Sequence, residues 1–404
     1  MIQVAVMGYG TIGSGVVEVL ETNKELIKKK TGQEIAVKYI LDLREFPGDP
    51  NEKKIVHDFS AIEKDNEVEI VVEAMGGVNP AYPFAKACLL AGKHVVTSNK
   101  ALVAAHGTEL ISLAKEREIN FLFEASVGGG IPLIRPLTQA LGAEQILEIS
   151  GILNGTTNYI LTKMNLEGQT FEAALLEAQE LGYAERNPEA DVEGYDTCRK
   201  ITILTALATG REVNYEEVPT EGITRITDTD FRYAAKLGTS IKLFGTSRME
   251  DGKVSAFVCP MMIDAEHALF AVNDVYNGVM VRGNTVGTVM FYGSGAGKLP
   301  TANAVVSDIV EIAGHRKDNI PCGWSSEKQD LAPMGELAFR YFIRFAGKAA
   351  EQQAAVEDAF GPVSVVELED MDEFAVVTGE MTEAEYQEKA KAFGGIRQMI
   401  RRSL

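Results

Sequence analysis

Two charged residues four positions apart, Asp196 and Lys200, are the strongest candidates for chemistry in this sequence. Residues at i and i+4 share one face of a helix, so the carboxylate and the amine are expected to meet. The apolar residues after Lys200 would bury this part of the helix, and a partly desolvated lysine has a lowered pKa. Such an amine exchanges protons near neutral pH, which suits general acid–base catalysis. The alternative is an ordinary pair on the surface of a helix.

Two more carboxylates, Glu185 and Asp191, precede this pair. Their density beside a lysine favours a functional site over a surface pair. Lys100 is a second candidate amine, because it follows a predicted strand in the segment TSNK (97–100). The carboxyl ends of strands in an open α/β sheet face the ligand crevice, so a cation there would hold a substrate or assist proton transfer. A solvent-exposed lysine is the alternative.

A glycine-rich turn, GYGTIG at 8–13, follows an apolar stretch and precedes an amphipathic one. Between a strand and a helix, Gly8 allows a tight turn, Gly10 lets the backbone approach a pyrophosphate, and Gly13 packs the helix on the strand. The N-terminus of the helix favours the negative charge. The pattern predicts a dinucleotide site, and a plain turn is the alternative.

The second predicted strand ends at Asp42, and Arg44 follows two residues later. An acid at this place favours a free ribose 2′-hydroxyl and hence NAD, whereas Arg44 would suit the 2′-phosphate of NADP. Both cofactors therefore stay open, as does a third case in which the two residues are solvated loop charges.

Strands alternate with helices over residues 1–127, which predicts a doubly wound parallel sheet of the Rossmann type. A helix at about 298–314 is expected to complete this NAD(P)-binding domain. The expected strands are 2–7, 35–41, 68–72, 94–97 and 120–123, and helices are expected after the glycine turn, at 81–91 and at 107–117.

The remaining chain is predicted to form two further units. Residues 128–312 are expected to be an α+β domain for substrate binding, catalysis and dimerisation, with an open sheet and helices on one face. Residues 313–334 form a polar linker. Residues 335–404 have the element order β-α-β-β-α-β, which is the ferredoxin-like pattern. In the middle unit we expect strands at 146–153, 240–244, 254–261 and across 267–292, and helices at 156–164, 171–181 and 190–210.

The composition excludes several classes of partner. Acids outnumber bases by 58 to 39 in 404 residues, giving a formal net charge of −19. Nucleic acids and anionic membranes attract Lys and Arg, so neither is expected as a partner. The four cysteines form no C-x-x-C pair and do not resemble a disulfide framework, which fits a protein of a reducing compartment. No signal peptide or membrane span is evident, so a soluble cytoplasmic protein is expected.

Taken together, seven segments resemble homoserine dehydrogenase over nearly the whole chain. The resemblance implies reversible hydride transfer between L-homoserine and L-aspartate 4-semialdehyde with NAD or NADP, a step toward threonine and methionine. The segments are GYGTIG (8–13), TSNK (97–100), EASVGGGIP (124–132), GILNGTTNYIL (151–161), GYAE (182–185), GYDTCRK (194–200) and GSGAGKLPTANAV (293–305).

The resemblance also implies roles for individual residues. Lys200 is expected to donate and accept the proton at the substrate oxygen, with Lys100 and Asp196 assisting. Substrate contacts are expected from Glu185, Asp191, Asp196, Gly155 and Thr156. Cofactor contacts are expected from Gly8, Gly10, Thr11, Ile12, Gly13, Asp42, Arg44, Ala74, Thr97, Lys100, Gly182 and Gly297.

The family has a monovalent cation site, for sodium or potassium, on the turn after the fifth strand. Here the carboxylate of Glu124 and the backbone carbonyls of Val127, Gly129 and Ile131 would supply the hard oxygen ligands. Such a cation would fix the junction of two domains. A plain interdomain turn is the alternative.

The tail resembles an ACT domain, a ferredoxin-like module that senses amino acids, which implies feedback by threonine. The family's Asp-x-Pro-Gly turn is replaced by FAGKA at 345–349, so a domain kept only for dimer contacts is the alternative. We expect a homodimer paired through the middle sheet, or a homotetramer. Two other functions stay open: an oxidoreductase on another amino acid or semialdehyde, and a non-catalytic amino-acid sensor.

Overall fold

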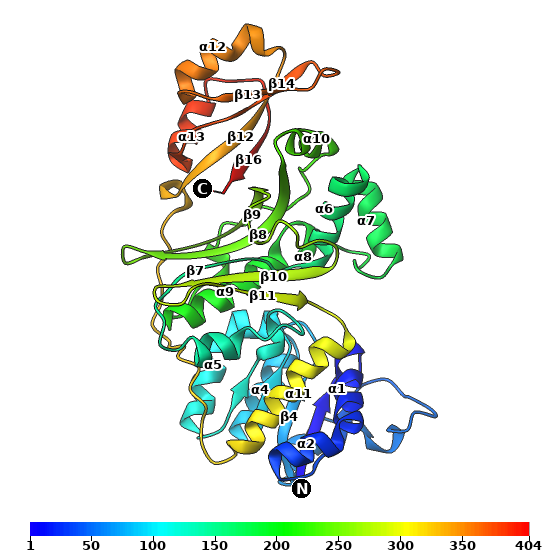
Figure 1. Ribbon diagram of the computed structural model, residues 1–404. Coiled ribbons are helices and arrows are strands. Elements are labelled where there is room, and N and C mark those ends of the chain that lie inside the picture. The colour runs from blue at the N-terminus through cyan, green and yellow to red at the C-terminus, as the bar shows by residue number, and fades with distance from the viewer. Residues whose placement is uncertain (404) are drawn as a thin grey trace.

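The computed structural model describes residues 1–403, which form three tiers stacked along one axis (Figure 1). The N-terminal tier holds a six-stranded sheet in the order β3-β2-β1-β4-β5-β6. Every pairing in it is parallel, which confirms the predicted doubly wound sheet. The strands are Ile2–Met7 (β1), Ile35–Leu41 (β2), Ile55–Val56 (β3), Val68–Glu73 (β4), His94–Thr97 (β5) and Phe121–Leu122 (β6).

Helices cover both faces of this sheet, as the near-continuous apolar strands require. Helices α1, α2 and α11 contribute to the apolar cluster on one face, and α4 and α5 to the cluster on the other. Helix α11 comes from far along the chain and packs on α1. The helices are Thr11–Thr22 (α1), Lys24–Thr31 (α2), Ser60–Glu63 (α3), Ala81–Leu90 (α4), Lys100–Glu116 (α5) and Lys298–Gly314 (α11).

The start of α5 differs from the prediction. The helix was expected from residue 107, but it begins at Lys100, because the side chain of Asn99 accepts a hydrogen bond from the amide of Leu102 and caps it. Gly107 does not break the helix. A Cβ there would lie 3.0 Å from the ring of Trp324, so this position is glycine for close packing. Lys100 is therefore the first residue of a helix.

The middle tier contains the long hairpin β8–β9, which lies between β7 and the last strand of the chain. The short strands expected at 240–244 and 254–261 are parts of this hairpin, whose turn residues Asp251 and Gly252 both have positive φ. The helix expected at 190–210 is divided at Gly194, which has a φ of 83°. The elements are Ile146–Ile152 (β7), Gly155–Glu167 (α6), Phe171–Glu180 (α7), Glu189–Val192 (α8), Tyr195–Thr209 (α9), Asp228–Lys236 (α10), Thr239–Glu250 (β8), Lys253–Asp264 (β9), Tyr276–Gly283 (β10) and Gly287–Ser294 (β11).

The C-terminal tier has the predicted β-α-β-β-α-β order with one added two-residue strand, β15, which pairs with β12. The other strands lie in the ferredoxin-like order β16-β12-β14-β13. The sequence predicted two separate sheets, but the structure joins them into one of ten strands. The joint is parallel pairing of Arg401 and Arg402 with Met261 and Met262. The elements are Ala338–Ala346 (β12), Ala349–Phe360 (α12), Ser364–Glu367 (β13), Glu373–Val377 (β14), Met381–Thr382 (β15), Glu383–Ala390 (α13) and Ile396–Arg402 (β16).

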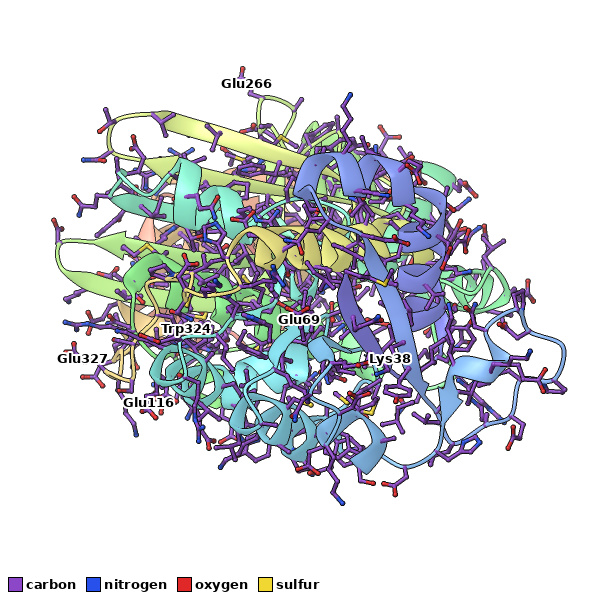
Figure 2. All side chains as sticks on the ribbon, turned by 90° about the horizontal axis from the view of Figure 1, so that it is seen from below. Lys38, Glu69, Glu116, Glu266, Trp324 and Glu327 are labelled. Carbon is purple, nitrogen blue, oxygen red and sulfur yellow. The ribbon has the colours of Figure 1, made fainter. Side chains whose placement is uncertain are left out.

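The segment predicted as a linker is an ordered strap that ties two tiers together. Trp324 is buried and donates from its ring nitrogen to Thr108 on α5, and the amide of the next residue donates to the carbonyl of Gly210 after α9. Figure 2 labels Trp324 and Glu327 on this strap. Within residues 1–403, no helix is long and apolar enough to cross a membrane.

Candidate active site

The glycine turn between β1 and α1 leaves no room for side chains at two positions. A Cβ on Gly13 would lie 1.8 Å from the carbonyl oxygen of Gly8, and one on Gly8 would lie 2.8 Å from that of Ala74. Gly10 begins α1 without a side-chain cap, so its first amides are open to a bound anion. A pocket of about 540 Å³ opens here, lined by Gly8, Gly10, Leu41, Asp42, Leu43, Arg44, His57, Phe59, Ala74, Met75, Pro80 and Phe84.

Asp42 and Arg44 lie together at one end of this pocket. The Asp42 carboxylate accepts hydrogen bonds from the amide of Tyr9 and from the amide, Nε and Nη2 of Arg44. The Arg44 side chain holds the pKa of Asp42 well below its usual range. Four donors thus occupy the carboxylate, while the Arg44 side chain is 62% exposed.

A buried carboxylate that the sequence analysis missed, Glu73, ends β4 next to this pocket. It accepts hydrogen bonds from Thr97 (2.6 Å) and from the amide of Met75 (2.8 Å). Burial raises its pKa. The hydroxyl of Thr97 also accepts from the amide of Asn99. This chain joins the ends of β4 and β5 and fixes the residue before Lys100. In the sequence, the charged residue at the end of an apolar strand could have indicated this role of Glu73.

Lys100 and Lys200 both contact the carboxylate of Asp196. Lys100 forms an ion pair with Oδ1, and Lys200 donates to Oδ2 at 2.7 Å. The i,i+4 pairing of Asp196 with Lys200 is thereby confirmed. Lys200 also donates to the carbonyl oxygen of Leu153 at 2.7 Å. Lys100 belongs to the N-terminal tier and Asp196 to the middle tier, so this contact bridges the two.

Asn154 organises the carboxylates of this cluster, and the sequence analysis did not single it out. Its Oδ1 accepts from the amide of Thr157 and caps α6, while its Nδ2 donates to Asp191 (2.7 Å) and to Asp196 (2.8 Å). All polar atoms of the side chain are therefore in use. Its position inside the NGTT turn was a usable signal, because an Asn before a helix is a strong cap.

The two lysines have opposite pKa shifts. The charge of Asp196 raises the pKa of Lys100. Burial lowers the pKa of Lys200, and the charge of Lys100 acts in the same direction. Burial opposes ionisation of Asp196, but the two lysines outweigh it and keep the pKa of this carboxyl below its usual range. Burial raises the pKa of Asp191. The cluster thus pairs a stably charged amine with one that releases its proton more easily.

Comparisons with known proteins point to one family. A family model described as "Homoserine dehydrogenase" matches residues 132–310, and one described as "Homoserine dehydrogenase, NAD binding domain" matches residues 8–124. A homoserine dehydrogenase of Synechocystis sp. is 41% identical over 85% of this chain and 82% of its own. The chain belongs to the homoserine dehydrogenase family. Its members are oxidoreductases with an NAD-binding domain.

Two solved structures of the family extend the comparison. A homoserine dehydrogenase from Thiobacillus denitrificans superposes with a TM-score of 0.90 at 33% identity, covering 100% of this chain and 98% of its own. A hyperthermophilic archaeal homoserine dehydrogenase in complex with NADPH has a TM-score of 0.66 at 28% identity and covers 77% of this chain. The fold expected from the family resemblance is therefore confirmed.

The structure does not gather all residues predicted for the site. The side chain of Glu185 is exposed and makes no hydrogen bond within the described part of the chain. Gly182 follows α7, near Tyr183, whose carbonyl accepts from the hydroxyl of Thr156. Of the predicted cofactor residues, the pocket beside the glycine turn is lined by Gly8, Gly10, Asp42, Arg44 and Ala74, and not by Thr11, Ile12, Gly13, Thr97, Lys100, Gly182 or Gly297.

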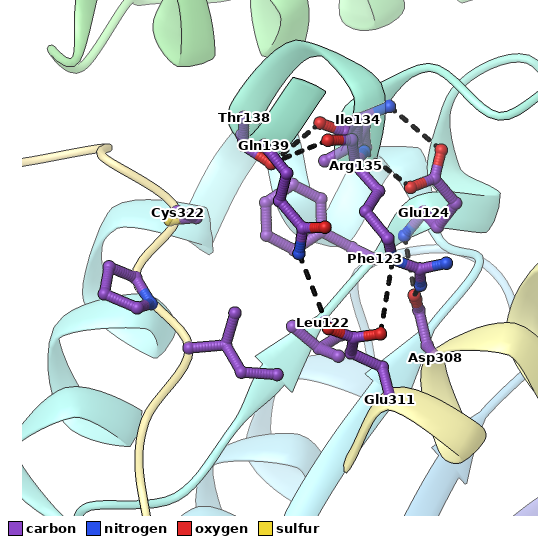
Figure 3. A pocket seen from close by; sticks show the side chains of 12 residues that line it. Leu122, Phe123, Glu124, Ile134, Arg135, Thr138, Gln139, Asp308, Glu311 and Cys322 are labelled. Carbon is purple, nitrogen blue, oxygen red and sulfur yellow. Dashed lines mark hydrogen bonds and ion pairs between the residues drawn. The ribbon is translucent and has the colours of Figure 1, made fainter. Parts of the chain in front are cut away.

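The carboxylate of Glu124, predicted as a cation ligand, accepts hydrogen bonds from three backbone amides. One oxygen accepts from the amides of Leu133 and Ile134, and the other from the amide of Arg135. Figure 3 shows this carboxylate turned toward that backbone, with Asp308 below it. The acid therefore satisfies the amides of a helical turn, which a charged group does strongly. Within residues 1–403, no cluster of three or more His, Cys, Asp or Glu side chains forms a metal site.

Ion pairs dock the C-terminal tier on the middle tier. Arg344 on β12 contacts Asp230 on α10 at 2.6 Å, and Arg401 on β16 contacts Glu221 at 2.7 Å. In the altered turn at 345–349, Gly347 has a φ of 90° and its amide donates to the carbonyl of Asp372. Part of the backbone expected to hold an effector is thus already bonded.

Proposed function

We propose that this chain interconverts L-homoserine and L-aspartate 4-semialdehyde, with Lys200 as the group that takes and returns the hydroxyl proton. The observation that carries this assignment is the contact of Lys100 and Lys200 with the two oxygens of Asp196. Hydride leaves a carbinol carbon only as its hydroxyl proton is removed, so a base must lie within hydrogen-bond reach.

Lys200 is suited to this exchange by its own contacts. Leu153 and Asp196 accept two of its hydrogens, so one position of Nζ is left for a substrate oxygen. Burial favours the neutral amine, which has the lone pair that accepts a proton. Lys100 keeps its charge beside Asp196. It would stabilise the negative charge that develops on the substrate oxygen. A bound nicotinamide supplies the hydride chemistry itself.

The ends of homoserine match the groups around the lysine pair. The first amides of α6, at Gly155 and Thr156, lie at a positive helix terminus that suits the substrate carboxylate. Asp191 and Glu185 supply negative charge for the substrate ammonium group, and Asp191 is already oriented by Asn154. Glu185 is exposed and would have to turn toward the substrate on binding.

The cofactor pocket favours NADP over NAD in this proposal. The Gly8–Gly13 cradle fits a pyrophosphate, because a Cβ would fill it. At the ribose end, Asp42 already accepts from four donors, which leaves it few lone pairs for a ribose hydroxyl. The exposed guanidinium of Arg44 suits a 2′-phosphate.

A sodium or potassium ion fits the turn after β6 through backbone oxygens. Within the described residues, the carbonyls of Val127, Gly129 and Ile131 accept no hydrogen bond. Hard oxygen ligands of this kind suit a monovalent cation, whose role would be to stiffen the domain junction. Glu124 would contribute indirectly, because its carboxylate holds the backbone amides that follow this turn in place.

The assembly and its regulation complete the proposal. The β10–β11 edge exposes Tyr276, Met290 and Tyr292, an apolar surface suited to a homodimer, with a homotetramer as the larger alternative. The ferredoxin-like module suits an ACT-type domain with threonine as its effector. A reducing cytoplasmic location fits the four free cysteines.

One assay tests the central assignment. Purified protein is mixed with L-homoserine and either NAD⁺ or NADP⁺, with sodium or potassium and with or without threonine. Reduction of the cofactor that depends on homoserine is expected, faster with NADP⁺. No turnover with either cofactor, for a protein shown to be folded, would reject the homoserine assignment and favour another substrate or a sensor.

A further inference from the structure

Asn277 is a buried asparagine that neither the lysine cluster nor the nucleotide pocket explains. It lies in β10 with no exposed surface. Neither its amide nitrogen nor its amide oxygen has a hydrogen-bond partner within residues 1–403. Buried polar groups without partners are rare, because each one costs stability, so a retained one needs a reason.

Two glycines pack against this side chain: Gly155, a predicted substrate contact, and Gly295, which lies between β11 and α11. A Cβ on Gly295 would lie 2.1 Å from the amide nitrogen of Asn277, and one on Gly155 would lie 3.6 Å from its Oδ1. Gly155 is the first residue of α6 and follows Asn154. Gly295 lies in the connection from β11 to α11, at the level where the middle tier meets the N-terminal tier (Figure 1). Asn277 thus touches segments that belong to both tiers.

The interdomain turn adds a third segment to this junction. A Cβ on Gly129 would lie 2.4 Å from the carbonyl oxygen of Gly295, and the amide of Gly130 donates to the carbonyl of Ser294. The turn after β6, the connection to α11 and the start of α6 therefore meet around one amide that is bonded to none of them.

A neighbouring asparagine shows that this region satisfies such groups where they are structural. Asn158 on α6 is equally buried, and its Nδ2 donates to the carbonyls of Val272, Asp274 and Tyr276. Its Oδ1 accepts from Lys242. Tyr276 immediately precedes Asn277, so Asn158 contacts the same end of β10 on which Asn277 lies. The absence of partners is a property of Asn277 and not of the region.

We propose that Asn277 is a positioning residue whose amide forms its hydrogen bonds when the two tiers close on bound cofactor and substrate. The backbone packed against this amide belongs to Gly155, at the start of α6 in the middle tier, and to Gly295, in the connection that leads into α11 on the nucleotide tier. Closure about this junction shifts these segments relative to each other. Asn277 then fixes the position of the start of α6, where substrate is expected to bind, relative to the nucleotide domain. This inference rests on the proposed function.

The test compares Asn277→Leu with Asn158→Leu, since leucine has nearly the shape of asparagine without its polar atoms. In the ligand-free protein, N277L should melt at the same temperature as the wild type or higher, because no hydrogen bond is lost. N158L should melt lower, because its partners are left unpaired. In N277L, kcat/KM for homoserine should fall about 10- to 100-fold, the scale of a misplaced substrate.

Ligand-induced shifts of the melting temperature distinguish a role of Asn277 in positioning substrate from a role in folding. NADPH with L-homoserine binds without turnover, since both are in the reduced form. NADPH alone should stabilise N277L as much as the wild type, whereas the extra shift from homoserine should be smaller in N277L. Unchanged kcat/KM and an unchanged homoserine shift in N277L would overturn the proposal, as would a loss of melting temperature matching that of N158L. If the proposed function itself is wrong, the wild type will show neither turnover nor a homoserine shift.

Discussion

Lys100 and Lys200 contact opposite oxygens of a single carboxylate, although one opens a helix of the nucleotide domain and the other lies within a helix of the middle domain. Asp196 lies between them and raises the pKa of Lys100, while burial lowers the pKa of Lys200. Two amines that would be equivalent in water are therefore unequal here. Such a separation of pKa values assigns one group to charge stabilisation and the other to proton transfer.

Replacement of Lys200 by methionine should abolish most turnover without loss of cofactor binding. The change keeps the length of the side chain but removes the proton acceptor, so we expect kcat to fall about 10²- to 10⁴-fold. Steady-state assays measure kcat, and quenching of protein fluorescence by NADPH measures binding. Lys163→Met on α6 is the control, because Lys163 pairs with Glu167 and Glu177 outside the cluster and should leave kcat unchanged. Equal activity of the two variants would reject Lys200 as the base.

Homoserine oxidation should increase with pH as Lys200 loses its proton. Only the neutral amine accepts a proton, and burial lowers the pKa of Lys200 from its ordinary value, so the rise should begin below the range of an exposed lysine. Asp196 opposes this shift, and Lys100 supports it. Asp196→Asn removes the negative charge, so the midpoint of kcat/KM against pH should move to lower pH. A midpoint that moves to higher pH would contradict the assignment.

Most of the nucleotide domain could be predicted from the sequence, because its signals are local, although the two-residue strand β3 and the short helix α3 were missed. An apolar strand, GYGTIG and an amphipathic helix are adjacent in the chain, and the alternation of strands with helices predicts a parallel sheet. The junction of the middle and C-terminal sheets was not predictable in this way. It consists of two residue pairs between strands that lie more than a hundred positions apart in the chain.

The site was predicted in part for the same reason. Asp196 and Lys200 were found because their spacing is a helical repeat. Asn154 and Asn277 were missed, since the role of an amide depends on which groups surround it in the fold. Glu124 was predicted as a cation ligand from the family resemblance, whereas its hydrogen bonds to amides nine to eleven residues away depend on the fold and had no local signal.

Asn154→Asp should impair turnover while leaving α6 intact. Aspartate is as good an N-cap as asparagine, but it replaces two donors with a third negative charge beside Asp191 and Asp196. A hydrogen bond to a charged group contributes about 1.5–3 kcal/mol, so loss of both should lower kcat/KM by about 10²- to 10⁴-fold. Thr170→Asp changes a comparable cap on α7 and should leave kcat/KM unchanged. Full activity of N154D would show that Asn154 serves only as a cap.

Arg44→Ala should change the preference between cofactors. Without the guanidinium, a 2′-phosphate loses its partner, and Asp42 regains lone pairs for a ribose hydroxyl. We expect kcat/KM for NADP⁺ to fall about 10- to 100-fold, with a smaller change for NAD⁺. The measurement is initial rates with each cofactor at saturating homoserine. Equal losses with both cofactors would indicate that Arg44 supports the loop rather than selects the ribose.

Arg344→Met should weaken the attachment of the C-terminal tier, because its partner on the middle tier, the carboxylate of Asp230, is buried. Arg344 contacts Asp230 at 2.6 Å and Glu373 at 3.1 Å, and its side chain is 9% exposed. Removal of one partner from a buried ion pair costs about 3–5 kcal/mol, since the remaining charge has no water. Arg232→Met on the same interface breaks an exposed pair with Asp370 and should have a much smaller effect, because water solvates both charges when the pair is broken. Urea unfolding followed by circular dichroism compares the two, and equal midpoints would show that the buried pair does not hold this tier in place.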